Sequence, residues 1–392
     1  MLARSPFAGV AWTDLQYVEG FRRLGHDVYY IEDTGGWSYD PEQDCMTDDG
    51  RYAARYLAGL MEWCGMPDRW AYRGAQGGSV TLGLSESQVN RVLEEADALI
   101  NLHGSTTLRE EHLSIPIRAY VETDPVRTQI ELAKGMQATI DWVGAHTHHF
   151  TYAENLGAAD CTIPACGVHY RPTRYPIILD WWTPESLSRT RGRKRSSPLR
   201  FTTVTSWDQS GDDIKWNGET YLWSKHLQFL KFIDVPRRSG RVLEMALASK
   251  DPKTVGLLTS NGWRVVDAMS RSSDILPYRE YIFGSDGEFT VAKDQYIRPR
   301  SGWFSDRSAC YLAAGCPVIT QESGFSNIFP TGEGLFGFQT MEGILEAFDV
   351  IHSDYERHSR AARAIAEEYF DAEAVLGRLT QDLVLRAQGP PV

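Results

Sequence analysis

The sequence has little positive charge, few cysteines and no long apolar run. Its 392 residues include 40 lysines and arginines against 52 acidic residues, a formal net charge of −12. Nonspecific nucleic-acid binding depends on basic side chains that neutralise phosphates, so this charge argues against that class. No stretch approaches the about 18 apolar residues of a membrane span, and the amino terminus lacks the apolar core of a signal peptide. We therefore expect a cytoplasmic protein that does not span a membrane.

The cysteine content and the chain length indicate the redox state of the thiols and the number of domains. Six scattered cysteines form no repeated framework, which predicts reduced thiols. The hydrophobic fraction of 42% and the charged fraction of 23% are ordinary for a globular protein. A chain of 392 residues exceeds what one hydrophobic core usually supports, which predicts two domains.

Short apolar strands alternate with helical patterns along the first half of the chain, as in βαβ units of a parallel sheet. Helices are predicted at 13–24, 51–64 and 87–95, and strands at 27–33, around 98–104 and around 117–125. The last two strands run into polar residues at their ends. Ligands of open α/β sheets lie beyond the carboxyl ends of strands, so a site is expected there.

The pattern lapses at 183–199, which contains five basic residues. We interpret this stretch as an exposed interdomain linker, the alternative being a nucleic-acid or nuclear signal. A second βα series follows it. Its predicted strands are 201–207, 242–247, 263–266 and 288–291, and its predicted helices are 221–233 and 252–260. The chain thus divides into a first domain at 1–182, a second at 200–355, and closing helices at 356–392.

A helix start, a helix and a buried strand follow one another within 302–320. Ser301 and Ser305 are N-cap candidates, and Gly315 ends the helix before a Cys-Pro-Val-Ile-Thr strand. A helix N-terminus offers unpaired N–H groups and a positive dipole end to an anion. Three basic side chains crowd this end and predict a diphosphate site: Arg298, Arg300 and Arg307.

Arg307 and the run 312–319 resemble the nucleotide-sugar half of the GT-B glycosyltransferases, where an R-x-x-E-A-L-A-A-G-x-P-V-I type unit receives the donor diphosphate and ribose. The run 22–28 resembles the helix end and second strand of their acceptor domain, and 331–335 resembles a loop of their donor domain. The likeness covers most of the chain in the order of its elements. It implies an α/β fold of two doubly wound Rossmann-like domains facing a cleft. The acceptor domain would come first, the donor domain second, and the closing helices would pack back on the first.

Two positions depart from the pattern of these enzymes. Cys310 stands where many of them carry a ribose-binding Glu, and Asp306, one turn earlier, is the replacement we consider. The run 5–12, with Gly9, resembles the loop after their first strand, but only four residues precede it. A strand of about five residues hardly fits there. We expect either a start further upstream or a short first strand.

The resemblance implies that basic side chains and a helix dipole replace a metal in stabilising the donor diphosphate. Lys293, after the strand 288–291, is the first candidate for a phosphate contact, ahead of the three arginines; Lys215 is a further one. Gly302 and Ser305 belong to the same site at the helix start. A solvated cation or a structural ion pair is the alternative role for each basic residue.

A general base is expected on the acceptor side. His103 follows a predicted strand and precedes Gly104, and an ordinary imidazole pKa of about 6.5 suits proton transfer. Asp124, at the end of the next strand, would orient His103 or replace it. The alternatives are a structural hydrogen bond for His103 and a helix N-cap for Asp124.

The segment 145–150 is dense in histidine, and Cys161, Cys166 and His169 follow downstream. This spacing matches no familiar zinc motif, so we predict no metal site. We interpret 144–150 instead as a loop that follows a strand at Trp142 and Val143 and lines the cleft. The acceptor-side candidates are His146, His148, His149 and Trp37.

These features predict a glycosyltransferase that moves a sugar from a nucleotide diphosphate sugar to a small-molecule acceptor, without cofactor or metal. One alternative is a nucleotide-sugar epimerase of the same fold, which has no separate acceptor site. A second is a catalytically silent nucleotide-sugar-binding protein. Turnover separates the three.

Overall fold

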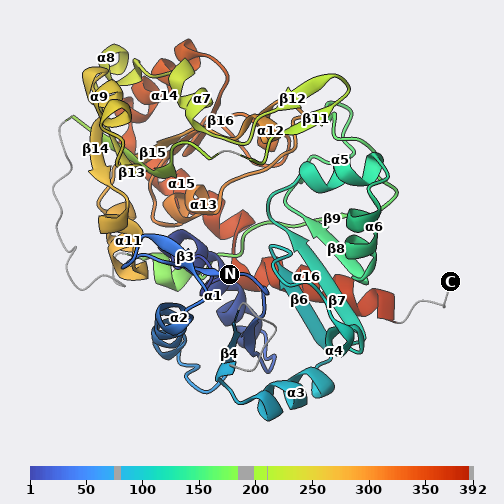
Figure 1. The fold of residues 1–392 in the computed structure, drawn as a ribbon. Helices are drawn as coiled ribbons and strands as arrows, with labels where there is room; N and C mark the ends of the chain where they lie inside the picture. The colour runs from blue at the N-terminus through green and yellow to red at the C-terminus, as the bar shows by residue number, and fades with distance from the viewer. Residues whose placement is uncertain (75–80, 184–197, 210, 388–392) are drawn as a thin grey trace.

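The computed structural model of the protein describes residues 1–74, 81–183, 198–209 and 211–387. Two α/β halves follow one another along the chain (Figure 1). The expected linker lies almost entirely outside the described residues, and the boundaries 182 and 200 stay predictions. No helix in the described ranges is long and apolar enough to cross a bilayer.

The second half is built on a six-stranded parallel sheet in the order β14-β13-β10-β15-β16-β17. Chain order reverses between β13-β10 and β15, the kind of switch point at which open α/β sheets bind ligands. Apolar side chains of Phe201, Leu243 and Phe289 form its core with helices from both ends of this half. The strands are β10 Arg200–Ser206, β13 Val242–Ala248, β14 Arg264–Asp267, β15 Gly287–Thr290, β16 Val318–Gln321 and β17 Leu335–Phe338.

The first half contains two sheets rather than one. Strand β1 pairs parallel with β4, and β5 adds antiparallel to β4, while β6 to β9 form a separate parallel sheet. Leu102 pairs with Val121, and Glu122 pairs with Thr151, so the carboxyl ends of β6, β7 and β8 share one edge. The strands are β1 Tyr30–Glu32, β4 Trp70–Arg73, β5 Thr81–Gly83, β6 Ala98–Leu102, β7 Ile117–Glu122, β8 His148–Thr151 and β9 Arg171–Pro172.

Helices and two hairpins connect these strands. In the first half lie α1 Ala8–Arg23, the hairpin β2 Ser38–Asp40 and β3 Cys45–Thr47, α2 Arg51–Trp63, α3 Glu86–Glu95, α4 Glu110–Leu113, α5 Arg127–Ala133, α6 Gln137–Gly144 and the 3-10 helix Leu179–Trp182. In the second lie the hairpin β11 Ile214–Trp216 and β12 Glu219–Tyr221, α7 His226–Lys231, α8 Val235–Ser239, α9 Pro252–Ser260, α10 Met269–Ser272, α11 Ile275–Phe283, α12 Asp294–Ile297, α13 Asp306–Ala313, the 3-10 helix Phe325–Asn327, α14 Met341–Ser353, α15 Tyr355–Tyr369 and α16 Ala372–Ala387.

Several sequence-based assignments are wrong. Trp142 and Val143 belong to helix α6, and His148 and His149 lie on strand β8 rather than in a loop. Periodicity does not distinguish a helix from a strand in so short an apolar run, which explains why these assignments are wrong. The predicted helix 221–233 is shorter, since only 226–231 form α7.

The chain start also differs from the expectation. Helix α1 begins at Ala8, so Gly9 lies in its first turn and not in a loop. Among residues 1–74, no strand precedes α1. Asp124 does not cap α5 either: Val126 occupies the N-cap with a φ of 90°.

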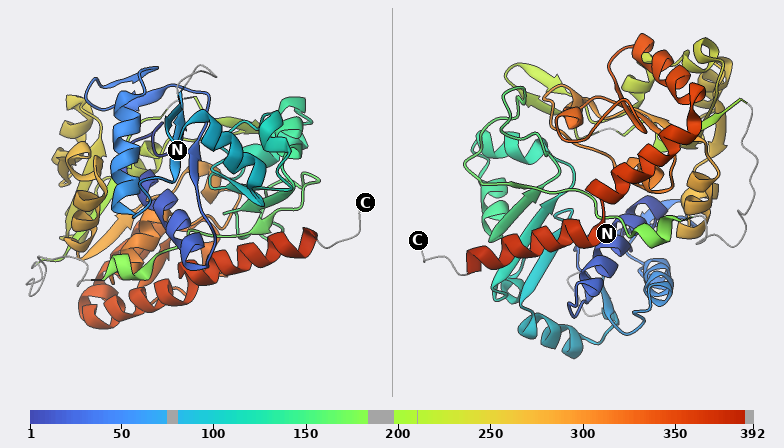
Figure 2. Two further views of the ribbon diagram at one scale, coloured as in Figure 1. Left: turned by 90° about the horizontal axis from the view of Figure 1, so that it is seen from below. Right: turned by 180° about the vertical axis from the view of Figure 1, so that it is seen from behind.

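Helix α1 is buried between the two halves. All residues from Ala11 to Gly20 are buried, including polar ones, as in a helix inside a large core. Gln16 illustrates how the polar ones are satisfied, because its Oε1 accepts hydrogen bonds from the Ile178 amide at 3.1 Å and the Trp182 indole at 3.1 Å. Helix α16 returns from the second half and packs on α1 and on strand β7 (Figure 2).

We expect Gly20→Val to destabilise the protein by about 1–3 kcal/mol, because a β-carbon at Gly20 would overlap the Leu376 side chain of α16. Thermal unfolding followed by circular dichroism measures the effect. Gly377→Ala on α16 is the matched control, since nothing lies within 4 Å of a β-carbon there. The control is expected to unfold at the same or a higher temperature. An unchanged Gly20→Val variant would contradict this packing.

Candidate functional site

Side chains that follow the carboxyl ends of strands join the two halves. Lys293, three residues beyond β15, donates from Nζ to Asp124 Oδ1 at 2.8 Å, and Asp124 lies two residues beyond β7. Tyr296 also donates to Asp124. The Lys293 ammonium lies 3.0 Å from the centroid of the Trp223 ring. Burial lowers the pKa of Lys293, and Asp124 acts in the opposite direction. The structure thus places two predicted site residues, Lys293 and Asp124, in direct contact across the halves.

Lys225 is a candidate site residue that the sequence analysis did not identify. It lies immediately before α7, with its Nζ 5.7 Å from the centroid of the Trp303 ring. Burial lowers the pKa of Lys225 to about 7, and repulsion from Arg307 and Lys293 adds to this effect. No carboxylate of the described residues forms an ion pair with it. Its sequence signal is weak, because Lys225 lies inside the predicted helix 221–233, whereas in the structure it directly precedes α7.

The start of helix α13 carries the diphosphate candidates Ser305 and Arg307. Ser305 is the N-cap residue, and its hydroxyl donates to Asp306 Oδ1 at 3.2 Å. The buried Arg307 guanidinium donates from Nε to Glu288 Oε1 at 2.5 Å, from Nη2 to Thr290 Oγ1 at 2.8 Å and from Nη1 to the Val204 carbonyl at 2.7 Å. Arg307 therefore supplies positive charge behind the helix start, while its donors are directed at protein acceptors.

Arg298 and Arg300 have partners elsewhere. Arg298 pairs with Asp294 at 3.1 Å and lies 4.0 Å from the centroid of the Tyr221 ring. Arg300 pairs with Asp160 at 2.7 Å. Arg298 therefore contacts α12 and β12, and Arg300 contacts the 155–160 loop.

Gly302 allows a close approach between the halves. Its φ is 81°, and a β-carbon there would lie 2.5 Å from the Asn155 amide nitrogen. The Asn155 amide in turn donates to the Ser301 carbonyl at 3.0 Å. Glycine is thus required at 302 both by the left-handed backbone and by the lack of space.

His103 forms two hydrogen bonds at the carboxyl end of β6. Its Nε2 lies 2.8 Å from Asp14 Oδ1, and its Nδ1 lies 2.8 Å from Thr123 Oγ1. The orienting carboxylate is therefore Asp14 on α1 and not Asp124. Burial raises the pKa of Asp14, but the positive amino terminus and His103 outweigh burial and hold it below its ordinary value. The sequence analysis did not identify Asp14, because a polar residue inside a predicted helix is expected on the solvent-exposed face.

Thr13 contacts both Gly9 and Asp306, the residues considered for the loop and ribose contacts of the donor. Its hydroxyl lies 3.2 Å from Asp306 Oδ2 and 3.2 Å from the Gly9 carbonyl. Thr13 and Gly9 belong to α1, and Asp306 is the first residue of α13. Cys310, one turn further along α13, is buried, and burial raises the pKa of its thiol.

The histidine-rich segment lies away from this edge. Strand register pairs His148 with Ala119, in the amino half of β7. His146 is buried, with Nε2 2.9 Å from Asn101 Nδ2, and burial lowers its pKa to about 4. His149 contacts the Val143 carbonyl at 3.0 Å. Trp37, in the loop before β2, has 54% of its surface exposed. The structure does not bring these four acceptor-side candidates to His103.

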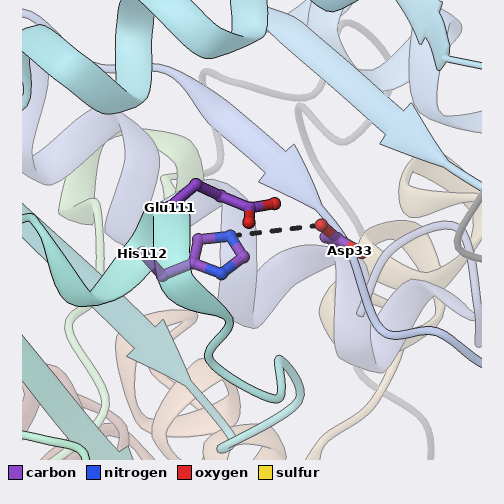
Figure 3. A group of neighbouring side chains, drawn as sticks. All are labelled: Asp33, Glu111 and His112. Carbon is purple, nitrogen blue, oxygen red and sulfur yellow. Dashed lines mark ion pairs between the residues drawn. The ribbon is translucent and has the colours of Figure 1, made fainter.

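One group of the described residues has donor atoms close enough to share a metal ion: Asp33, Glu111 and His112, within 4.8 Å of one another (Figure 3). Two guanidinium groups already neutralise its carboxylates. Arg73 Nη1 donates to Asp33 Oδ2 at 3.1 Å and to Glu111 Oε1 at 3.0 Å, and Arg109 bonds the same two acids. A cation would have to displace both arginines, so the donor set fits an ion-pair network better than a metal centre.

Comparisons with known proteins support the fold. No family model matches the chain, and no curated protein sequence matches it. Among solved structures, AviGT4, a glycosyltransferase involved in avilamycin A biosynthesis, is 12% identical with a TM-score of 0.52, over 97% of this chain and 91% of that one. Anabaena Alr3699/HepE in complex with UDP and glucose is 12% identical with a TM-score of 0.53, over 96% of each chain.

A glycosyltransferase from Rickettsia africae ESF-5 is 9% identical with a TM-score of 0.55, over 98% of this chain and 96% of that one. The protein has the GT-B fold. At these identities the likeness concerns the fold alone. In the GT-B fold of this protein, Lys225, Lys293 and the start of α13 belong to the second half, and His103 and Asp14 to the first.

Exhaustive chelation is expected to leave the melting temperature unchanged, because Arg73 and Arg109 neutralise the acids of the candidate metal group. Differential scanning fluorimetry before and after EDTA treatment measures the melting temperature. As a control, the stripped protein is titrated with magnesium, manganese and zinc. A melting temperature that falls with EDTA and recovers with one of these ions would overturn the prediction.

Proposed function

We propose that the protein is a metal-independent cytoplasmic glycosyltransferase that moves a hexose or related sugar from a nucleotide diphosphate sugar to a small-molecule acceptor, without a cofactor. The observation that carries the proposal is the pair Lys225 and Lys293 in a GT-B fold. Each lies against an aromatic ring beside the start of α13, and Lys225 has no ion-pair partner among the described residues. All six cysteines are free, which supports the cytoplasmic location, where thiols stay reduced.

The donor diphosphate is the anion that suits these cations. The N–H groups at the start of α13 and its dipole favour negative charge, and Arg307 adds to the positive field behind them. Lys293 would break its hydrogen bond to Asp124 and donate to a phosphate oxygen instead. The Asp124 side chain is half exposed, so water would solvate its carboxylate. Negative charge that develops on the leaving diphosphate is then stabilised by groups already in place.

The first half supplies a base for the acceptor hydroxyl. When His103 Nε2–H donates to Asp14, the other ring nitrogen is an acceptor, and the Thr123 hydroxyl donates to it. An acceptor hydroxyl that replaces Thr123 would pass its proton to Nδ1 as its oxygen bonds to the anomeric carbon. The bond from that carbon to the phosphate oxygen breaks, and the diphosphate leaves with the electron pair.

Thermal stabilisation by a panel of nucleotide sugars identifies the donor, because a ligand at about 100 times its dissociation constant adds about 2.7 kcal/mol to stability. Product analysis then separates the alternatives. A transferase releases nucleoside diphosphate and a glycosylated acceptor, an epimerase yields an altered donor, and a binding protein yields neither.

Lys225→Met is expected to weaken nucleotide-sugar binding about tenfold or more, since a hydrogen bond to a charged group contributes about 1.5–3 kcal/mol. The pH dependence is a sharper test. The Lys225 pKa of about 7 means that the ammonium is charged below that pH, so affinity is highest there and falls as pH rises through about 7. Because the diphosphate of a nucleotide sugar does not titrate in this range, Lys225→Met should flatten the profile.

Lys293→Ala and Arg307→Ala complete the series. Lys293→Ala is expected to weaken binding, while Arg307→Ala is expected also to destabilise the fold because it leaves the buried Glu288 unpaired. Isothermal titration calorimetry on folded variants measures the affinities. If Lys225→Met and Lys293→Ala both bound nucleotide sugars as the wild type does, the diphosphate placement would be wrong.

His103→Ala is expected to lower turnover about 10²- to 10⁴-fold and to leave donor affinity nearly intact, because donor binding is assigned to the other half. Asp14→Asn, which keeps the shape of the side chain, should also lower turnover. Steady-state kinetics with calorimetric donor binding measures both effects. A purely structural His103 would instead lower the melting temperature and leave normal turnover in the folded fraction.

A further inference from the structure

Two buried tyrosines, one from each half, carry hydroxyl groups that form no hydrogen bond among the described residues. Tyr175 follows β9 in the first half and is 7% exposed, and Tyr278 lies on α11 and is 3% exposed. Neither hydroxyl oxygen belongs to the fully enclosed polar atoms that lack a partner in this part of the chain, so each oxygen still reaches solvent. A reachable, unpaired hydroxyl on a buried ring is a group that a ligand can bond.

Asp306, the first residue of α13, is the nearest charge to both hydroxyls. Burial raises the pKa of Tyr175 and of Tyr278, and the negative charge of Asp306 raises each pKa further. Both phenols therefore keep their proton at neutral pH and can donate it in a hydrogen bond. Because the carboxylate acts on both phenols without a hydrogen bond to either, a gap separates the three groups.

Packing of α1, α11 and α13 on one another sets the position of this gap. The Tyr278 hydroxyl lies at the first turn of α1, since it would stand 3.9 Å from a β-carbon on Gly9. The half-buried Asp306 accepts the Thr13 hydroxyl with one oxygen and the Ser305 hydroxyl with the other, each at 3.2 Å. A carboxylate accepts about four hydrogen bonds, so Asp306 keeps lone pairs for a ligand.

Tyr175 connects the gap to the groups assigned above to the reaction. After Asp306, the carboxylates of Asp124 and Asp14 also act on the pKa of Tyr175. These two acids are the partners of Lys293 and His103. The gap thus lies between the cations assigned to the diphosphate and the histidine assigned to the acceptor, where the transferred sugar has to lie.

The charges around the gap indicate which sugars suit it. Asp306 forms no ion pair among the described residues. Asp124 adds a second unpaired carboxylate once Lys293 donates to a phosphate oxygen. A sugar that carries a carboxylate would meet these acids, whereas a neutral sugar can donate a hydroxyl to Asp306 and accept from the phenols.

We propose that Tyr175, Tyr278 and Asp306 bind the transferred sugar of the donor and select a neutral sugar over a uronic acid. This inference rests on the proposed function, because it names the sugar class of the same donor. The two phenols donate to sugar oxygens, and a sugar hydroxyl donates to the carboxylate. A sugar that leaves one of these groups unpaired is rejected, since a polar group without a partner is costly in a closed site.

Isothermal titration calorimetry on the full-length protein tests the proposal with two matched series: UDP-glucose, UDP-glucuronate and UDP, and GDP-mannose, GDP-mannuronate and GDP. In the series that binds, we expect the wild type to bind the neutral sugar nucleotide about tenfold or more tightly than the uronate. Tyr175→Phe and Tyr278→Phe should each weaken binding of the neutral sugar nucleotide about three- to tenfold, because each removes one hydrogen bond. Both variants should bind the bare nucleoside diphosphate as the wild type does.

Asp306→Asn tests the selectivity, because it keeps the shape of the side chain and removes its charge. The preference for the neutral sugar nucleotide over the uronate is expected to shrink in this variant. Tyr281→Phe, on the same helix as Tyr278, and Tyr170→Phe, in the first half, are the matched controls. Their hydroxyls also lack a partner among the described residues but are fully enclosed, so both controls should bind every ligand like the wild type.

The bare nucleotides separate failure of this inference from failure of the proposed function. A loss confined to the sugar nucleotides supports both. If nucleotide sugars bind but Tyr175→Phe or Tyr278→Phe binds them normally, or loses the bare nucleotide in the same proportion, the sugar placement is overturned and the proposed function stands. Equal or tighter binding of the uronate by the wild type would also overturn the inference. A wild type that binds neither nucleotides nor any nucleotide sugar of the wider panel would contradict the proposed function, and the sugar placement with it.

Discussion

The all-round burial of α1 is the constraint on which the arrangement of the two halves depends. This helix contacts both halves with successive residues: Trp12 bonds the start of α11, Thr13 bonds the first residue of α13, and Asp14 bonds His103. Buried polar groups of this kind must be paired, because an unpaired one costs about 1–3 kcal/mol. The pairing fixes the rotation of α1, and with it the position of His103 relative to the second half. The close approach of α16 at Gly20 fixes the opposite face.

Positive charge is concentrated near the start of α13, in spite of the overall negative net charge. Lys225 and Lys293 lie against aromatic rings in the second half, where burial lowers the pKa of each. Arg307 forms a buried ion pair with Glu288, and its charge acts on Lys225 by electrostatic repulsion.

The sequence predicted the order of the elements well where patterns are long. The helix–strand unit at 302–320, the strands around His103 and Asp124 and the parallel sheets all appear in the structure. The errors fall on short apolar segments such as Trp142 and Val143, where neither period is long enough to decide. Division of the first half into two sheets was also missed, since pairing between distant strands is not written in local periodicity.

By itself, the sequence determined the α/β class and the positions of Lys293, His103 and Asp124 at strand ends, because alternation and strand ends are local properties. Only the tertiary structure decided which of these side chains meet. It paired His103 with Asp14, 89 residues earlier in the chain, and Asp124 with Lys293. It also paired Arg298 and Arg300 with other acids and left Lys225 without an ion-pair partner among the described residues. The physical reason is that partner choice among charges depends on distance and burial, which follow from the packing of the whole chain.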